Sequence, residues 1–263
     1  MVPAPSRVRA KSVIRKLRQA FFPQPYLWQT IAEPTLSGIT GQYPTARTEL
    51  LDLVSGTPRR LVDLGCGNGM TASAAKSRFP EAEVVGIEQN PASAKLAAER
   101  LDRVIITSIE QLDYDSHGLA EGSIDVAFLL DVLEHLYDPW DALCRLRSRL
   151  APAGQIIASI PNARNYWLLS RLVNDGNFSY DSNGLLDITH IRFFTRHEIE
   201  KMFAETGYKI VQMVSNYDDR VPEVLPLQSE NDRTDKFVLQ NLTANDVKEF
   251  RTLQFYVVAT PMT

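Results

Sequence analysis

The ten residues LVDLGCGNGM, at positions 61–70, constrain the fold of this chain more than any other stretch. An apolar run typical of a buried strand leads directly into three glycines at alternate positions, Gly65, Gly67 and Gly69. Glycine lets the backbone approach a ligand closely and leaves main-chain N–H groups free to point at it. The stretch therefore predicts a strand, a ligand-binding turn and a helix.

The residues after this turn alternate between short β-rich runs and helical stretches, which predicts a parallel sheet with crossover helices. Helix starts are marked by Asn90-Pro91, by Asp138-Pro139 and by a capping box at Thr195 and Glu198. A lead-in helix is expected at 46–54, before the sheet. Seven strands are expected, at 60–64, 83–88, 104–107, 124–129, 155–160, 209–214 and 253–259.

The chain divides into a basic N-terminal arm with a lead-in segment, residues 1–44, and one α/β domain, residues 45–263. Two stretches, 163–193 and 216–241, interrupt the alternation and are expected to be insertions, which often form lids or binding loops. In the arm, residues 7–18 hold six basic side chains and precede the first acid, Glu33. This segment fits contact with an anionic membrane, a grip on a phosphorylated substrate, a transit peptide, or a solvated helix docked on the domain.

The bulk composition is ordinary for a globular protein, with 44% hydrophobic and 23% charged residues. A net charge of −4 provides no field that attracts nucleic acid to the whole protein. The two cysteines, Cys66 and Cys144, exclude a disulfide framework and fit a reducing compartment. Because a membrane-spanning apolar run and a signal peptide are also not expected, the predicted location is the cytoplasm.

Two ligands suit a glycine turn of this kind, a dinucleotide and S-adenosylmethionine. The dinucleotide fingerprint GxGxxG fails because Met70 stands at its third glycine position, while Gly69 comes one residue early. Asp63 would repel a pyrophosphate, but its carboxylate can accept hydrogen bonds from an ammonium group. Glu88 ends the second strand, where a carboxylate can bind both ribose hydroxyls of either ligand.

The run Asp63-x-Gly-x-Gly-x-Gly, residues 83–101 and the stretch IDVAFLLDVLEHLYDP at 124–139 resemble the class I S-adenosylmethionine-dependent methyltransferases. This resemblance implies a Rossmann-like α/β fold, with a seven-stranded sheet in the order 3-2-1-4-5-7-6 and the seventh strand antiparallel. It also implies S-adenosylmethionine as the cofactor. The cofactor-binding residues that it implies are Asp63, Gly65, Cys66, Gly67, Asn68 and Gly69 around the methionine part, Glu88 and Gln89 at the ribose, Ser108 and Ile109 at adenine, and Asp131.

Acceptor chemistry is expected just after the fourth strand, where Asp131, Glu134 and His135 follow i, i+3, i+4 spacing. On a helix all three side chains would share one face. His190 comes later, in LLDITHIRFFT. Two carboxylates and two imidazoles suit a divalent metal ion. A metal-free catalytic His135 or His190 and a purely structural role stay open as alternatives.

The same residues resemble two groups of methyltransferases. Small-RNA terminal 2′-O-methyltransferases and some ubiquinone-pathway O-methyltransferases carry ExxEH with a later histidine, although this chain has Asp131 at the first acid. The stretches DVLEHLYDPW, ASIPNARNYW and LLDITHIRFFT are similar to bacterial methyltransferases of surface-polysaccharide synthesis. That similarity implies a glycan acceptor, for which Arg164 and Arg192 would bind an acidic part. A sugar-facing wall would come from Trp140, Tyr166, Trp167, Phe178 and Tyr180.

The leading hypothesis is an O-methyltransferase that acts on a sugar, glycan or small-molecule hydroxyl. Ribose 2′-O-methylation of RNA with a divalent metal is an alternative, which the acidic chain disfavours. A non-catalytic module that binds S-adenosylmethionine is a third possibility, and an NAD oxidoreductase is a remote one. Methylation of DNA or protein amino groups is disfavoured because Ile160-Pro161-Asn162 stands where an N/D-P-P-Y motif would be.

Overall fold

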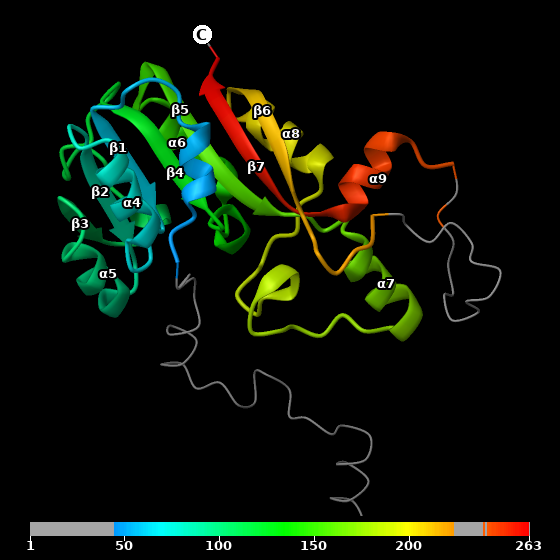
Figure 1. Cartoon of the computed structure of the whole chain (residues 1–263). Helices are drawn as coiled ribbons and strands as arrows, with labels where there is room; N and C mark the ends of the chain where they lie inside the picture. Colours follow the sequence, from blue (N-terminus) through cyan, green and yellow to red (C-terminus); the bar gives the residue numbers. More distant parts are fainter. Residues whose placement is uncertain (1–44, 224–238, 240, 263) are drawn as a thin grey trace, which may run out of the picture.

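The computed structural model of the protein describes residues 45–223, 239 and 241–262. Its centre is a seven-stranded sheet in the order β3-β2-β1-β4-β5-β7-β6 (Figure 1). β5 and β6 each pair antiparallel with β7, while the other neighbouring strands are parallel. The expected sheet order and the reversed seventh strand are confirmed. The strands are β1 (Arg60–Leu64), β2 (Glu83–Glu88), β3 (Arg103–Ile106), β4 (Ile124–Leu130), β5 (Leu150–Pro161), β6 (Tyr208–Tyr217) and β7 (Thr252–Pro261).

The helices begin where the sequence provides caps. Asn90 accepts hydrogen bonds from the backbone N–H groups of Ala92 and Ser93, and Asp138 accepts one from Asp141. Thr195 and Glu198 form the expected capping box. The helices are α4 (Met70–Arg78), α5 (Pro91–Ala98), α6 (Pro139–Arg147), α7 (Tyr166–Asp175), α8 (Arg196–Glu205) and α9 (Ala244–Arg251).

Apolar side chains from alternating strand positions cover the two faces of the sheet. Val62, Ala127 and Ile156 belong to one buried cluster, together with residues of α6 and α8. Leu61 and Phe128 belong to the other, with residues of α4 and α5. This alternation is the pattern that a sheet covered by helices on both faces requires. The carboxyl ends of the parallel strands are thereby left for a site.

The lead-in segment is shorter than expected. It forms a 3₁₀ helix, η1 (Thr48–Leu53), which packs Leu50 and Leu51 against the sheet instead of making an α-helix over 46–54. The preceding residue, Arg47, is thereby placed at the edge of the site, where its side chain is buried. The arm at 1–44, including the basic segment 7–18, lies outside the described residues.

The insertion at 163–193 carries secondary structure of its own. It contains α7 and a 3₁₀ helix, η4 (Gly184–Leu186). Phe250 of α9 packs with Val221 and with Tyr166 and Trp167 of α7 in a small separate cluster. Figure 1 shows α7 and α9 at one end of the sheet, away from α5. Of the second insertion, residues 224–238 and 240 lie outside the described residues.

Within the described part of the chain, no helix combines the length and the apolar character needed to cross a bilayer.

Candidate active site

The glycine turn, residues 65–69, connects β1 to α4 with a backbone that only glycine adopts freely. Gly65 and Gly69 both have φ +78°. A Cβ on Gly65 would lie 2.7 Å from Cγ2 of Val132, which follows β4. The turn therefore packs directly against the loop that carries the expected acceptor residues, and it has no room for a side chain.

Glu88 lies at the carboxyl end of β2, beside the glycine turn. Its Oε2 accepts a hydrogen bond of 2.9 Å from the backbone N–H of Gly67, and its Oε1 accepts one of 2.7 Å from Asn90. These bonds hold the carboxylate at the strand end predicted for the ribose diol. Gln89, the next residue, is exposed.

Asp63 and Cys66 lie on either side of Gly65, and both are buried. Burial, together with the nearby charge of Glu88, raises the pKa of Asp63 from 3.8 to about 7. Burial likewise raises the pKa of the Cys66 thiol, so this group stays protonated. Asp63 is therefore a buried acid that a cationic ligand would hold in its ionised form.

Ser108 and Ile109, the residues predicted to lie at adenine, make local contacts. Ser108 Oγ accepts a hydrogen bond of 3.2 Å from the backbone N–H of Gln111, which caps the 3₁₀ helix η2 (Ile109–Gln111). Ile109 is buried near Gly65. Neither of them lines the cavity described next.

A cavity of about 530 Å³ opens at the carboxyl ends of β1 and β4. Asp63, Gly65, Cys66 and Asn68 line one part of it, and we call this the cofactor side. Asp131, Glu134, His135 and His190 line another part, the acceptor side. Asn183, Gly184, Leu185 and Asp187 of the first insertion also line it. Cofactor and acceptor residues predicted from separate motifs therefore border one space.

Asp131 leaves β4 with φ +54°, a left-handed conformation that is rare for a residue with a side chain. Arg47 Nη1 donates a hydrogen bond of 2.6 Å to its Oδ2. Gln254 Nε2 and Ser159 Oγ donate to its Oδ1 at 2.6 and 2.9 Å. Backbone strain of this kind costs about 1–3 kcal/mol and persists only where surrounding contacts hold it. Here an ion pair and two hydrogen bonds hold it.

This placement separates Asp131 from the other expected metal ligands. The segment after β4 is a 3₁₀ helix, η3 (Leu133–His135), which begins two residues after Asp131. The prediction that Asp131, Glu134 and His135 share one face of a helix is therefore wrong. Among the described residues, the group able to hold a metal ion consists of Glu134, His135 and His190, with one ligand atom of each within 4.8 Å of the others.

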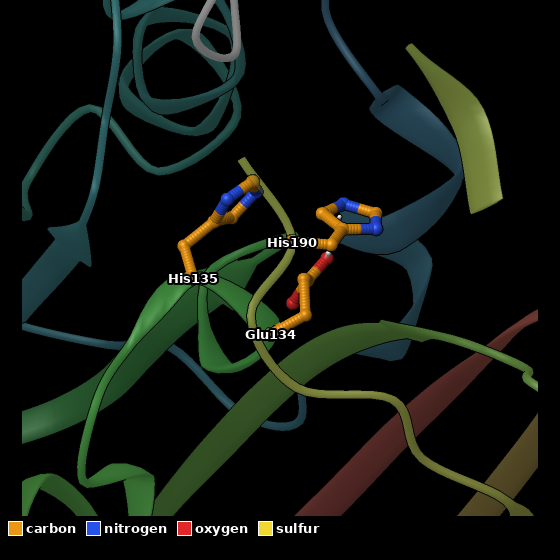
Figure 2. A group of neighbouring side chains, drawn as sticks. All are labelled: Glu134, His135 and His190. Atoms are coloured by element: carbon orange, nitrogen blue, oxygen red, sulfur yellow. Dashed lines mark ion pairs between the residues drawn. The ribbon is translucent and has the colours of Figure 1, made fainter. Parts of the chain in front are cut away.

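We call Glu134, His135 and His190 the acceptor cluster (Figure 2). The backbone N–H groups of Ile191 and Arg192 both donate to the Glu134 carbonyl at 3.0 Å, which fixes the second segment against the first. The two imidazole rings lie edge to face, with centroids 4.8 Å apart. Figure 2 shows the Glu134 carboxylate directed toward His190, and its Oε1 lies 3.9 Å from His190 Nε2.

Both imidazoles are oriented through Nδ1. His135 Nδ1 lies 3.1 Å from the carbonyl oxygen of Thr189, and His190 Nδ1 lies 3.2 Å from that of Leu185. Because a carbonyl only accepts, each contact places the proton on Nδ1 and leaves Nε2 of the neutral ring as a base or a metal ligand. Thr189 Oγ1 also contacts His135 Nδ1 at 3.0 Å and donates to Asp187 Oδ1 at 2.5 Å.

Glu134 is 1% exposed, and neither carboxylate oxygen has a hydrogen-bond partner among the described residues. Burial and the charge of Asp131 raise its pKa well above the usual 4.5. Burial also lowers the pKa of His190, so that ring is neutral. A buried carboxyl group without a partner is costly unless a proton or a cation accompanies it.

The expected sugar-facing wall is only partly placed near the cluster. Phe178 and Phe193 are exposed by 45% and 37%, with ring centroids 5.8 Å apart, and Phe193 lies 6.5 Å from His190. Tyr166 and Trp167 instead pack in the α7–α9 cluster. Trp167 lies there under the guanidinium of Arg220, 3.9 Å from its ring centroid.

The two arginines expected to bind an acidic acceptor point elsewhere. Arg164 pairs with Asp246 and Glu249 of α9, at 2.9 and 3.0 Å. Arg192 donates to the carbonyl of Tyr137. Neither side chain lines the cavity.

Sequence reasoning did not find several residues that complete the site. Arg47 precedes the lead-in helix, and Gln254 lies on the last strand, so no motif marks them. Thr189 and Asp187 fall inside LLDITHIRFFT, where their spacing of two residues was the available signal.

Comparison with known proteins shows which protein family the chain matches. The family profile of the methyltransferase domain matches residues 39–213. An uncharacterized 37.1 kDa protein in transposon TN4556 of Streptomyces fradiae is 27% identical over 187 residues, which cover 70% of this chain and 50% of that protein. Trans-aconitate 2-methyltransferase of Methylobacterium radiotolerans is 33% identical over 105 residues, 40% of this chain and 39% of that enzyme. The matched part of the chain thus spans half or less of the length of these relatives.

Solved structures show the same fold. The putative methyltransferase in complex with the Trm112 activator of Haloferax volcanii aligns with a TM-score of 0.57 and 13% identity, over 87% of this chain and 93% of that one. A possible histamine N-methyltransferase of Thermotoga maritima aligns with a TM-score of 0.52 and 18% identity, over 81% and 86%. The sheet order, the glycine turn and the profile match agree. The chain belongs to the methyltransferase domain family.

Proposed function

We propose that this chain uses S-adenosylmethionine to methylate a hydroxyl group of a sugar, a glycan or another small molecule. One observation carries the proposal: the glycine turn with Asp63 and the acceptor cluster border the same cavity. A methyl donor and a hydroxyl acceptor must meet in one space, because an in-line displacement requires the reacting atoms about 3–3.5 Å apart.

The cofactor side has the groups that S-adenosylmethionine requires. Main chain without a side chain at Gly65 permits close approach, and Asp63 accepts hydrogen bonds from the ammonium group. The Glu88 carboxylate at the end of β2, outside the cavity lining, is the group proposed for the ribose diol. When bound, the cofactor supplies an electrophilic methyl group on a sulfonium.

The acceptor cluster has a base for the hydroxyl. With its proton on Nδ1, His135 presents a free Nε2 to the cavity lined by Glu134 and His190. In the reaction the acceptor oxygen bonds to the methyl carbon, the carbon–sulfur bond breaks and its electron pair stays on sulfur. His135 takes the hydroxyl proton, so the products are a methyl ether, neutral S-adenosylhomocysteine and an imidazolium.

A divalent cation is a second element of the proposal. One carboxylate and two imidazoles suit such an ion, and the unpartnered oxygens of Glu134 support a cation at this place. Glu134, His135 and His190 would hold it, and with the cation bound His135 would act as a ligand in place of its role as a base, whereas Asp131 is engaged by Arg47. A bound cation would lower the pKa of the acceptor hydroxyl.

The acceptor in the name of one relative, trans-aconitate, does not suit this cavity. Trans-aconitate is a tricarboxylate, and Arg47, the one basic side chain among the described residues lining the cavity, pairs with Asp131. Ribose methylation of RNA requires binding of phosphates, which the acidic cavity does not favour. The aromatic pair of Phe178 and Phe193 near His190 supports a sugar ring, whose apolar face packs on aromatic rings.

The test is incubation of the full chain with S-adenosylmethionine labelled in the methyl group, with methyl hexosides, lipid-linked sugars and small RNAs as acceptors. Parallel samples contain either EDTA or added Mg²⁺. We expect label in a sugar methyl ether. Loss of that label in EDTA and its return with Mg²⁺ would support the cation.

Calorimetry with S-adenosylhomocysteine separates the parts of this proposal. Heat without any methyl transfer would indicate a non-catalytic binding module, and label in RNA would indicate the ribose methyltransferase. The absence of heat from folded protein would contradict the cofactor assignment itself.

A further inference from the structure

On the cavity wall, acidic side chains outnumber arginine and lysine side chains. Among the described residues, one basic side chain lines the cavity, that of Arg47. The rings of His135 and His190, also on the wall, are oriented by contacts of Nδ1 to carbonyl oxygens. The acids that line the cavity are Glu49, Asp63, Asp131, Glu134 and Asp187.

The charge of Arg47 is not available to an acceptor. Its Nη1 forms the 2.6 Å ion pair with Asp131, and its Nε lies 3.4 Å from Glu49. On the acceptor side this leaves the carboxyl groups of Glu134 and Asp187, with no guanidinium or ammonium from the described residues. A bound anion would meet these carboxyl groups there without a guanidinium or ammonium partner.

The burial of Glu134 adds an energetic cost to this excess of acidic side chains. This residue is 1% exposed and both of its oxygens lack a hydrogen-bond partner among the described residues, so water does not screen its charge. Such a group favours a proton, a metal ion or a cationic ligand beside it, and it offers no positive charge to an anion.

Aromatic rings next to His190, outside the cavity lining, have the same preference. A row of rings leads from Phe178 through Phe193 and His190 to His135, with successive centroids 5.8, 6.5 and 4.8 Å apart. The face of an aromatic ring is the negative end of its quadrupole, so it attracts cations and the C–H face of a sugar. Arg192, the basic residue beside Phe193 in sequence, is bonded to the carbonyl of Tyr137.

We propose that the acceptor group entering this cavity has no negative charge, and that the site selects neutral or positively charged hydroxyl compounds, such as neutral sugars and amino sugars, over acidic ones. This inference rests on the proposed function for the identity of the reacting group. The preference for an acceptor without negative charge rests only on the side chains that line the cavity.

The test uses three hydroxyl fragments of the same size that differ in charge: ethanolamine, ethylene glycol and glycolate. Each is titrated at neutral pH, with EDTA, into full-length protein saturated with S-adenosylhomocysteine. NMR signals of the His135 and His190 ring protons report occupancy of the acceptor side. We expect ethanolamine to bind at least about tenfold more tightly than glycolate, with ethylene glycol between them.

A pair of variants locates the effect. Glu49→Gln removes one carboxylate from the cavity wall, and Glu81→Gln removes one from an exposed position that does not line the cavity. Ethanolamine binding should weaken about threefold in Glu49→Gln and stay unchanged in Glu81→Gln.

Equal or tighter binding of glycolate would overturn the inference, and so would the absence of any shift from ethanolamine. An equal effect of the two variants would also contradict it, because the preference would then come from net charge. Failure of the proposed function would give a different result. Labelled methyl would not be transferred to any of the hydroxyl compounds, while the preference for ethanolamine would persist.

Discussion

The cofactor side of the cavity is lined by one short stretch of chain, which contributes Asp63, Gly65, Cys66 and Asn68. The acceptor side instead brings together side chains from four separate places, residues 47, 131–135, 187–190 and 254. A substitution in the glycine turn therefore changes the backbone conformation. A substitution on the acceptor side instead changes a network of hydrogen bonds and ion pairs between side chains. The difference predicts that the two sides respond separately to mutation and pH.

The largest effect is expected from His135→Ala, which should separate catalysis from cofactor binding. Loss of a general base typically costs a factor of 10²–10⁴, so we expect turnover to fall about a thousandfold. Affinity for S-adenosylhomocysteine, measured by calorimetry, should stay within about twofold. His197→Ala, at an exposed position in α8, is the matched control. Equal activity in both variants would show that His135 is not the base.

The next effect is expected from Gly65→Ala, which changes the glycine turn. The new Cβ would meet Val132 at 2.7 Å in a backbone conformation with φ +78°. We expect a loss of about 2 kcal/mol in cofactor binding or in folding free energy, measured by calorimetry and chemical denaturation. Gly56→Ala has a similar φ of +74° and open space around it. If both variants lose the same amount, strain alone explains the result and the close approach is unimportant.

A smaller effect is expected from pH. Asp63 has a pKa of about 7 in the empty site, and an ammonium ligand would favour its ionised form. Binding therefore releases a proton below pH 7, and affinity rises with pH until Asp63 is ionised in the free protein. Between pH 6 and 8 we expect affinity for S-adenosylhomocysteine to rise about tenfold. Asp63→Asn should bind more weakly and lack this dependence. An unchanged slope in that variant would assign the proton to another group.

The smallest effect is expected from Thr189→Val, which loosens the acceptor side without removing a cluster residue. The hydroxyl that connects His135 to Asp187 would be lost, while the carbonyl contact to Nδ1 stays. We expect a decrease in kcat of about fivefold and a shifted pH profile, with KM for S-adenosylmethionine unchanged. Thr189→Ser should restore both quantities. A profile that does not move would limit Thr189 to a packing role.

The cofactor side could be predicted from the sequence because its signals are local. Three alternate glycines, the acid at Asp63 and the strand-end Glu88 lie close together in the chain, and the strand positions follow from the alternation of apolar runs. All seven strands were placed within a few residues, although β5 begins at Leu150 rather than at 155. The roles of the predicted cofactor residues stay predictions.

The acceptor side was predicted only in part, because its geometry depends on contacts between distant segments. Spacing put Asp131 with Glu134 and His135, but a left-handed backbone at Asp131 and a 3₁₀ helix at Leu133–His135 turn it toward Arg47. The register that pairs Ser159 with Tyr256 brings Gln254 to the same carboxylate. Neither contact leaves a periodic signal in one sequence.

The position of β7 has a consequence for the order in which the protein is made. β7 is the last strand to leave the ribosome, yet it lies between β5 and β6 and carries the amide that donates to Asp131. The segment 63–88 emerges far earlier and has its main-chain turn within itself. Asp131 therefore receives its hydrogen bond from Gln254 only after β7 has inserted between β5 and β6, long after the residues of the glycine turn have been made.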